Sequence, residues 1–288
     1  MQTIQLSRNA PVVLIDASYF SIHRLFATSR WWSMKNKTAE AAGALASLMS
    51  NFGSDADGFE EALIKHTEAD IQKIQKKWGL IGRGNKAIAP NNLIFCVDCA
   101  PSTIWRLDVY GDYKKRYRNG KLEQPSCGQP DCIHAIKYRS HLAIGHPRLE
   151  ADDVACLIFR QVRAVMGNEH PIVIISGDHD FLQLKDDHTE IYSLPFKNLW
   201  EAGIKKGTAD IMVKVLMGDP SDDIPRVLTK KQIEAYMGKS PEERDAFLAK
   251  LGKTAAYERN KMLMCWSNIP THLAEEFNRK WEIRNSSS

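Results

Sequence analysis

Acidic side chains follow three short apolar runs in this 288-residue chain. The runs VVLID, LIFCVD and IVIISGDHD end at Asp16, at Asp98 and at the pair Asp178 and Asp180. Because each run is continuously apolar and rich in β-branched or aromatic residues, we expect three strands covered on both faces. Ligands of an open parallel sheet bind at the carboxyl ends of its strands. One such aspartate is usually a turn or capping residue, but three predict a shared acidic site.

Two further acidic segments extend this set. Glu150, Asp152 and Asp153 open a predicted helix, and Asp219 and Asp222 lie in the loop GDPSDD. Alone, the first group would complement a helix dipole and the second would form Asx turns. Combined with the strand ends, they indicate eight carboxylates in one cleft: Asp16, Asp98, Glu150, Asp152, Asp178, Asp180, Asp219 and Asp222.

Eight carboxylates in one cleft would repel one another strongly. Each pair near 4 Å costs about 1 kcal/mol in water and about 4 kcal/mol at a protein surface. The groups must therefore be protonated or neutralised by cations, and all-oxygen ligation favours Mg²⁺ or Mn²⁺ over zinc. A crowded carboxylate site suits two ions about 4 Å apart, one activating water and one stabilising the leaving oxygen of a phosphodiester. The pattern predicts a phosphodiester hydrolase.

A basic segment accompanies the acids. Residues 106–121 contain six Lys or Arg against two Asp, a local balance of 6 − 2 = +4. Within it, aromatic rings alternate with cations, which suits bases stacking on rings while cations follow the phosphates. We expect Tyr113, Lys115 and Arg116 to bind nucleic acid, and Lys114 to stabilise charge on the scissile phosphate. A nearby arginine would help to orient this phosphate; Arg118 is the candidate, with Arg116 as the alternative.

The spacing of apolar runs predicts how these residues are positioned. Strands are expected at 12–15, 93–97, 172–175 and around 190–194, and helices at 38–50, 59–78 and 150–166. This alternation is typical of a mostly parallel α/β sheet flanked by helices, which we assign to residues 1–208. Residues 106–148 break the pattern and are expected to leave the sheet as a long excursion, partly helical and partly loop.

Strand signals disappear from about Asp210 onward. Short helices are expected at 209–217, 229–237, 241–251, 254–265 and 270–282, with a frayed end from Asn285. We therefore predict a smaller, all-helical C-terminal region over residues 209–288 that binds DNA. Lys230 and Lys231 are its candidate phosphate contacts.

Composition limits the class of protein. With 43% hydrophobic and 26% charged residues and a net charge of +4, the chain has the balance of a globular protein, which excludes wholesale disorder. It contains no apolar run approaching the roughly 20 residues of a membrane span and no signal-peptide pattern. Scattered cysteines fit a reducing cytoplasm. Cys127, Cys132 and His134 could bind zinc, but their loose spacing favours reduced thiols in a solvated loop.

The acidic motifs also identify a family. The segments VVLIDASYFSIHRLFA, FCVD, the YK of GDYKKRYR, LEADDV, ISGDHDFLQL and MGDPSDDIP occur in this order. With them the chain resembles the metal-dependent 5′-nucleases, which include flap endonucleases and the 5′-nuclease domain of bacterial DNA polymerase I. The resemblance is greatest to the bacteriophage T4 ribonuclease H branch.

This resemblance implies a PIN-like 5′-nuclease fold, with a helical arch formed by the 106–148 excursion. It places the eight acids on the family's ligands for two Mg²⁺ ions, Asp153 on the neighbouring acid and Lys114 on the lysine of the YKxxR motif. It further implies removal of RNA primers and flaps from 5′ ends during lagging-strand replication. The resemblance also implies a monomer that acts in the cytoplasm, which is the host cytoplasm if the protein is phage-encoded. A single-strand-binding protein or a sliding clamp is the expected partner.

The chain departs from the family at three places. Tyr117 stands where the family's motif has arginine, and His23 stands where many relatives have arginine. After Asp222 the sequence RVLTKKQIEAYMGKS replaces the glycine hairpin GIGxKTA, with which relatives grip a duplex.

The sequence predicts a 5′→3′ exonuclease and flap endonuclease acting on DNA or RNA–DNA hybrids. One alternative is a PIN-like endonuclease for single-stranded RNA, which normally lacks the basic arch and the acidic GDxxD loop. Another is a protein that binds branched DNA without cutting it. The intact acids argue against the latter, because binding alone gains nothing from buried negative charge.

Overall fold

The computed structural model describes residues 1–36, 58–118, 141–206 and 210–286. Its centre is a six-stranded sheet with the strand order β4-β3-β2-β5-β6-β7. The strands are β2 (Val12–Asp16), β3 (Leu93–Val97), β4 (Leu142–Gly145), β5 (Ile172–Ile175), β6 (Thr189–Ser193) and β7 (Lys197–Asn198). All neighbours pair parallel except β6 and β7, which pair antiparallel. The expected mostly parallel α/β sheet is confirmed, including its fourth strand as β6.

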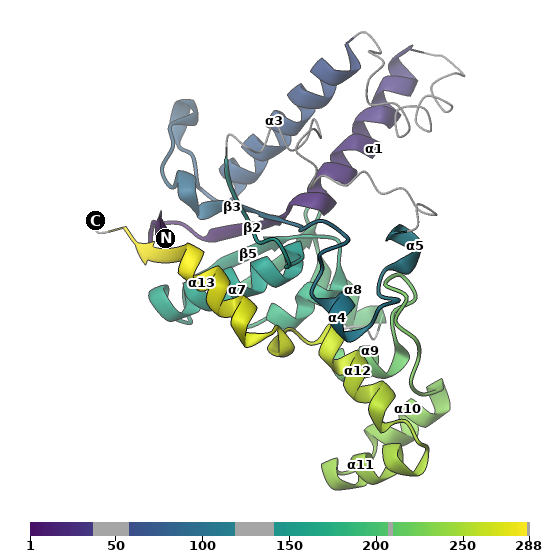
Figure 1. Cartoon of the computed structure of the whole chain (residues 1–288). Helices are drawn as coiled ribbons and strands as arrows, with labels where there is room; N and C mark the ends of the chain where they lie inside the picture. The colour runs from purple at the N-terminus through teal and green to yellow at the C-terminus, as the bar shows by residue number, and fades with distance from the viewer. Residues whose placement is uncertain (37–57, 119–140, 207–209, 287–288) are drawn as a thin grey trace.

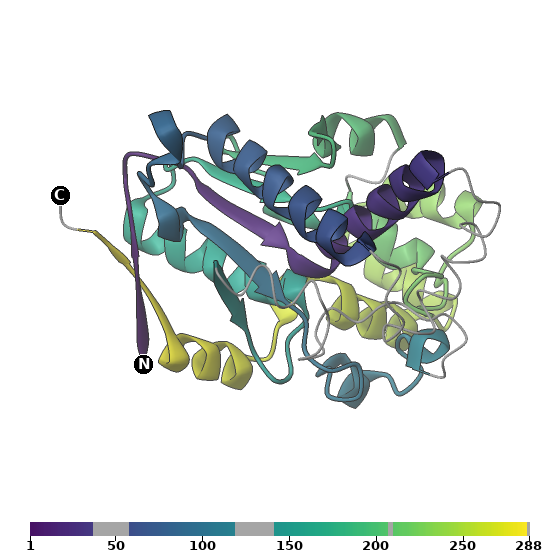
Figure 2. The same cartoon turned by 90° about the horizontal axis from the view of Figure 1, so that it is seen from above.

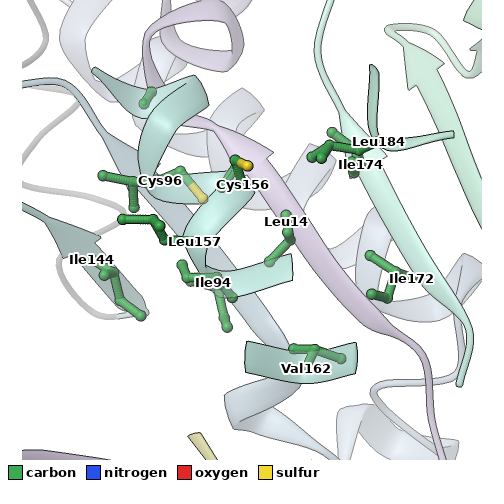
Figure 3. Close-up of a cluster of buried hydrophobic side chains, with 14 of the residues drawn as sticks. Leu14, Ile94, Cys96, Ile144, Cys156, Leu157, Val162, Ile172, Ile174 and Leu184 are labelled. Atoms are coloured by element: carbon green, nitrogen blue, oxygen red, sulfur yellow. The ribbon is translucent and has the colours of Figure 1, made fainter. Parts of the chain in front are cut away.

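Helices cover both faces of this sheet. Figure 1 shows α1 (Ala17–Asn36) and α3 (Phe59–Lys77) on one side, with α7 (Ala151–Met166) and α13 (Thr271–Lys280) on the other. Because successive strand residues point to opposite faces, Leu14 and Ile94 pack toward Leu157 of α7 (Figure 3). Ile15, next in the chain to Leu14, belongs to the separate core on the α1 and α3 side. Such two-sided burial explains why these strands read as continuous apolar runs.

Short helices complete the connections between strands. They are η1 (Arg83–Asn85), η2 (Pro90–Asn92), α4 (Arg106–Val109), α5 (Lys115–Arg118), η3 (His179–Leu184) and α8 (Leu199–Lys206). The excursion expected over 106–148 begins with α4 and α5, but it ends sooner than predicted, because 142–145 form the edge strand β4 beside β3. The helix expected at 38–50 and the zinc candidates Cys127, Cys132 and His134 lie outside the described residues.

The C-terminal part is mainly helical, as expected. It contains α9 (Ile211–Met217), α10 (Lys230–Met237), α11 (Pro241–Lys250), α12 (Thr254–Met264), η4 (Trp266–Asn268) and then α13. Side chains of α9 to α12 share one apolar core with Ile104 and Tyr113 from the segment after β3. The helical part therefore packs onto the same loops that carry the basic residues. Among the described helices, none combines the length and apolarity needed to cross a membrane.

The prediction of an all-helical C-terminal region is wrong at its end. The helix expected over 270–282 stops at Lys280, and β8 (Trp281–Asn285) pairs parallel with β1 (Gln2–Leu6) in a two-stranded sheet (Figure 2). Asn285, expected to be frayed, belongs to this strand. Ile283 lies opposite Ile4 in the register, and both side chains are buried in the main core. Burial against a strand at the other end of the chain overrides the local helical pattern.

This pairing predicts that the last strand contributes to global stability. Replacing Ile283 with alanine should lower the free energy of unfolding by about 2–4 kcal/mol, the range for truncating a buried aliphatic side chain. The matched control is Arg284→Ala on the exposed side of the same strand, expected to change stability by less than about 0.5 kcal/mol. Urea denaturation measures both. Equal, small effects of the two substitutions would mean that β8 is dispensable.

Candidate metal centre

The three strand-end aspartates lie at neighbouring strands. Asp16 is the last residue of β2, Asp98 directly follows β3, and Asp178 follows β5 after a two-residue turn. β2 lies between β3 and β5 in the sheet. Ser176 donates a 2.9 Å hydrogen bond from Oγ to Asp16 Oδ2, which joins the ends of β2 and β5. The predicted convergence of acids at one sheet edge is therefore present.

The N-terminus of α7 adds acids to this edge. The backbone N–H of Ala151 donates to Asp98 Oδ1 at 2.7 Å, and Ser18 donates to the other oxygen of Asp98. Glu150 is the N-cap residue of α7, and Asp152 lies in its first turn. Asp152 Oδ2 accepts a 3.1 Å hydrogen bond from the Trp266 indole. The helix start is thus fixed against the end of β3 with its carboxylates at the site.

A buried arginine neutralises the α7 acids. Arg106, which is 2% exposed, donates from Nη1 to Glu150 Oε2 at 2.8 Å. It also holds both oxygens of Asp153, at 2.7 and 2.8 Å, and one of these accepts from the Trp105 indole as well. Charge-assisted, two-pronged contacts of this kind are the strong ones. Both carboxylate oxygens of Asp153 therefore accept hydrogen bonds from Arg106 or Trp105.

A second internal cation, Lys214 of α9, lies at the opposite part of the cluster. Its ammonium pairs with Asp180 and lies 3.1 Å from Asp219 Oδ2. Asp180 is in the first turn of η3, which Asp178 caps by accepting from the Asp180 N–H at 2.9 Å. Lys214 thus joins the acids after β5 to the acidic loop after α9.

Lys114 and Tyr113 bridge the two halves of the cluster. Lys114 Nζ lies 2.6 Å from Glu150 Oε1 and 3.7 Å from Asp222 Oδ1. The Tyr113 hydroxyl donates to the same two carboxylates, at 2.9 and 3.2 Å. Lys114 has a φ of 49°, which is unusual for a residue with a side chain. Its N–H donates to the Asp222 carbonyl at 2.9 Å, which holds this conformation.

The crowding changes the acidity of the carboxyl groups. Burial raises the pKa of Asp16 to about 7, and the neighbouring Asp98 adds to the shift. Burial together with Asp178 raises the pKa of Asp180 to about 7, even though Lys214 opposes it. The same cause, loss of water, raises the pKa of Asp98, Asp152 and Asp222.

The pKa values of two acids in the cluster, Glu150 and Asp219, are lowered. Burial alone would raise the pKa of Glu150, but Lys114 and Arg106 hold it below its usual value. Burial is likewise outweighed at Asp219, whose pKa Lys214 lowers. The pKa is raised at five acids, mainly by burial, and lowered at two, where Lys or Arg outweighs burial, so the cations of the chain offset burial at only part of the cluster. An all-carboxylate donor set with uncompensated charge fits hard divalent cations.

All eight predicted acids belong to this contact network. The carboxylate oxygens of Glu150, Asp152 and Asp153 lie within 4.8 Å of one another, which is close enough for one ion. Asp153 differs from the other acids, because Arg106 and Trp105 already occupy both of its oxygens. The sequence predicted which acids lie together. Only the contacts in the structure show that Asp153 differs from the others, because both of its oxygens are already hydrogen-bonded.

The basic residues are distributed differently from the prediction. Lys114 lies over the acids as expected, whereas Arg118 is exposed and donates to the backbone carbonyls of Gly111 and Tyr113. Lys115 pairs with Asp112 at 2.9 Å. The ring of Tyr113 is only 3% exposed, so its predicted stacking with a base is wrong. The ring instead packs in the core of the helical part and aims its hydroxyl at two acids.

Other predicted nucleic-acid contacts lie at the surface. Arg116 pairs with Asp223 at 2.6 Å. Lys230 and Lys231 are exposed in the first turn of α10. The residues that sequence reasoning missed are Arg106, Lys214, Ser18, Ser176 and Trp266. One signal was present for Lys214, because it is the only charged residue in the apolar helix 211–217.

Comparison with known proteins gives concordant matches. The family model described as "5′-3′ exonuclease, N-terminal resolvase-like domain" matches residues 11–210. Ribonuclease H of Enterobacteria phage T4 is 28% identical over 196 residues, which cover 64% of this chain and 60% of that protein. DNA polymerase I of Streptococcus pneumoniae is 29% identical over 185 residues, which cover 59% of this chain and 20% of that protein. The matched part is therefore less than two thirds of either relative.

Solved structures show a shared fold. T5 5′-exonuclease with bound divalent metal ions (zinc) superposes with a TM-score of 0.54 at 14% identity, covering 94% of this chain and 97% of that chain. A bacteriophage T5 flap endonuclease in a pseudo-enzyme–product complex with DNA and metal ions gives a TM-score of 0.55 at 15% identity. That match covers 93% and 96% of the two chains.

The partly compensated acid cluster predicts stabilisation by divalent cations. Adding Mg²⁺ or Mn²⁺ at about 100 times its dissociation constant should stabilise the fold by about 2.7 kcal/mol, a rise in melting temperature of roughly 5–10 °C. Scanning calorimetry after EDTA treatment measures the shift, with KCl at matched ionic strength as control. A melting temperature that does not change with the divalent ion, or changes equally with KCl, contradicts the prediction.

Lys214 provides a second prediction about the same cluster. Replacing it with methionine keeps much of the side-chain volume but removes the cation between Asp180 and Asp219. The metal-free variant should lose about 3–5 kcal/mol of unfolding free energy, because removing one partner of a buried ion pair leaves charge uncompensated. The divalent ion should then raise its melting temperature more than that of the wild type.

The matched control for this substitution is Lys76→Met on the exposed surface of α3. Urea denaturation in EDTA, followed by calorimetry with and without Mn²⁺, compares the three proteins. If Lys214→Met and Lys76→Met behave alike in both measurements, Lys214 does not compensate the cluster.

Proposed function

Because the chain belongs to the 5′-3′ exonuclease family, we propose that it hydrolyses phosphodiester bonds at the 5′ ends and flaps of DNA and of RNA paired to DNA. The resemblance seen in the sequence is confirmed by the family match. The observation that carries the proposal is the convergence of eight carboxylates from strand ends, α7 and the 218–225 loop, with Lys114 above them.

Two Mg²⁺ ions are the proposed cofactors, and Mn²⁺ is expected to substitute. The eight carboxylates would hold them, and Asp153 would position Arg106 rather than bind an ion. Once bound, two such ions would lower the pKa of an attacking water and stabilise charge on the leaving oxygen. The raised pKa values of Asp16 and Asp180 support this proposal, because they mark carboxyl groups that lack enough compensating charge.

Lys114 is the proposed phosphate-binding residue. Its side chain is 30% exposed, and its ammonium lies 2.6 Å from Glu150. Its contacts with Glu150 and Asp222 hold the ammonium in place, and a preorganised cation stabilises developing charge on a phosphate. Tyr113 supports this arrangement by donating to Glu150 and Asp222. Arg118 would act from the exposed end of α5.

The rival functions differ in features of this site. A PIN-like ribonuclease for single-stranded RNA normally lacks the basic segment and the GDxxD loop. Here Lys114 and Arg116 contact Asp222 and Asp223 of that loop directly, which favours the 5′-nuclease. A non-cleaving DNA-binding protein would gain nothing from the cluster's buried charge. A single-strand-binding protein or sliding clamp as partner, a monomeric state and a cytoplasmic location stay predictions.

The test is a single isosteric substitution at the cluster. Asp152→Asn should reduce Mg²⁺-dependent cleavage of a 5′-labelled flap and of a nicked duplex by at least roughly a hundredfold, since it removes one charged ligand. Binding of the uncut flap should remain, and the metal-free melting temperature should hold or rise because asparagine replaces a carboxylate whose ionised form is disfavoured by burial. Gel analysis of sized products and calorimetry provide the readouts.

Asp186→Asn is the control for this test, because Asp186 pairs with Arg163 away from the cluster and its loss should leave cleavage intact. Asp178→Asn should behave like Asp152→Asn. Full cleavage by either cluster variant would reject the assignment. EDTA-resistant cleavage by the wild type would reject the dependence on metal.

A further inference from the structure

A second positively charged feature lies beside the acid cluster. A pocket of about 330 Å³ opens between α5 and the loop that joins α9 to α10. Arg116, Asp223 and Arg226 contribute its charged groups, and Met217 and Pro220 form part of an apolar wall. Asp223 is the residue after Asp222 of the cluster, so the pocket adjoins the site without being part of it.

The charge of this pocket is not fully compensated. Arg116 contacts Asp223 through its backbone N–H at 3.0 Å and its Nε at 2.6 Å, so both oxygens of Asp223 are engaged. Within the described part of the chain, the two Nη groups of Arg116 make no hydrogen bond, and the guanidinium of Arg226 has neither a hydrogen bond nor an ion pair. The pocket lining therefore holds two guanidinium groups against one carboxylate, a balance of 2 − 1 = +1.

The loop that forms the pocket is held in place. Asp219 and Ile224 exchange two backbone hydrogen bonds, of 3.0 and 2.8 Å. Gly218 has a φ of 69°, and a Cβ there would lie 2.5 Å from the Ile224 carbonyl, so no other residue fits without movement. Asn260 of α12 donates to the Pro225 carbonyl at 2.8 Å. A preformed pocket of this kind requires little ordering when it binds a ligand.

We propose that this pocket binds a phosphodiester group of the substrate strand, at a nucleotide other than the one that is cleaved. The inference rests on the proposed function, because it takes a nucleic acid as the substrate. Guanidinium groups match phosphate oxygens in pairs, and the apolar wall suits the sugar faces next to a phosphate. A strand approaching eight acids needs cations immediately outside them.

The pocket also accounts for a departure in the sequence. Arg226 is the first residue of RVLTKKQIEAYMGKS, the segment that stands in place of the family's glycine hairpin. In this segment the N-terminus of α10 is closed by its own capping box between Thr229 and Gln232. The chain thus satisfies the helix start internally and offers the Arg226 side chain to the backbone of the substrate instead.

The first experiment measures how binding depends on salt. Fluorescence anisotropy in EDTA follows a labelled 5′-flap DNA between 50 and 200 mM KCl, for the wild type, Arg226→Gln and the control Lys76→Gln. Arg226→Gln should bind about tenfold more weakly at 100 mM salt and lower the slope of log K against log salt by about 1. The control should match the wild type.

A salt slope of Arg226→Gln equal to that of the wild type overturns the proposal. An equal loss of affinity in Lys76→Gln, or no DNA binding by the wild type, also overturns it. Because Arg226 is exposed, the melting temperature should stay constant. A fall would assign the effect to folding, and Arg226→Lys then serves as the second variant, with the salt slope expected to return to the wild-type value. Failure of that return also overturns the proposal.

The second experiment locates the phosphate. A set of flap substrates carries one neutral methylphosphonate at successive positions. A methylphosphonate at one non-scissile position should weaken binding by the wild type. The same methylphosphonate should not weaken binding by Arg226→Gln any further. If inorganic phosphate protects the wild type against thermal unfolding but no methylphosphonate position distinguishes the two proteins, the pocket is only an anion site and the proposal fails.

These measurements separate the pocket from the nuclease activity, since binding in EDTA does not require cleavage. If the wild type never cuts DNA but the salt slope of Arg226→Gln is lower than that of the wild type by about 1, the proposed function is rejected and the pocket is kept. Normal cleavage with unchanged binding in Arg226→Gln rejects the pocket and keeps the function.

Discussion

Repulsion among carboxylates at one edge of the sheet is the constraint on which the rest of this structure depends. At an effective dielectric constant of about 20, each pair near 4 Å costs about 4 kcal/mol, which is comparable to a large part of the stability of a domain. The chain offsets this cost with three buried or half-buried cations, Arg106, Lys114 and Lys214. Neutral donors such as Ser176 add hydrogen bonds to the ionised forms.

The same cations also fasten the helical C-terminal part to the sheet. Arg106 donates from Nε to the carbonyl of Leu263 in α12 at 2.7 Å while its other nitrogens hold the α7 acids. Lys214 reaches from α9 to Asp180 after β5. Trp266, which follows α12, donates to Asp152. Charge compensation and docking of the helical part are therefore one set of interactions, so both regions contribute to the acid cluster.

The sequence predicted the acids well because their signal is local. An aspartate after a continuously apolar run needs only the rule that parallel strands end at one edge, and this rule placed Asp16, Asp98 and Asp178 correctly. The partners follow no such rule. In the sequence, Arg106 is one of several cations in a segment that is expected to be exposed. In the folded chain it pairs with Asp153 and only 2% of its surface is exposed. Tyr113 was misread for the same reason, since tertiary burial decided between stacking and hydrogen bonding. β8 depends on a partner strand nearly 280 residues away in sequence.

The arrangement of charge also limits how Lys114 can serve a substrate. Its ammonium lies 2.6 Å from Glu150, and this bond lowers the pKa of that acid. A phosphate approaching Lys114 must compete with Glu150, because one ammonium cannot fully neutralise both. Lys114 is therefore available to a phosphate to the extent that the acids are compensated by other cations. The charge balance of the acids and the availability of Lys114 to an anion are therefore coupled through one ammonium group.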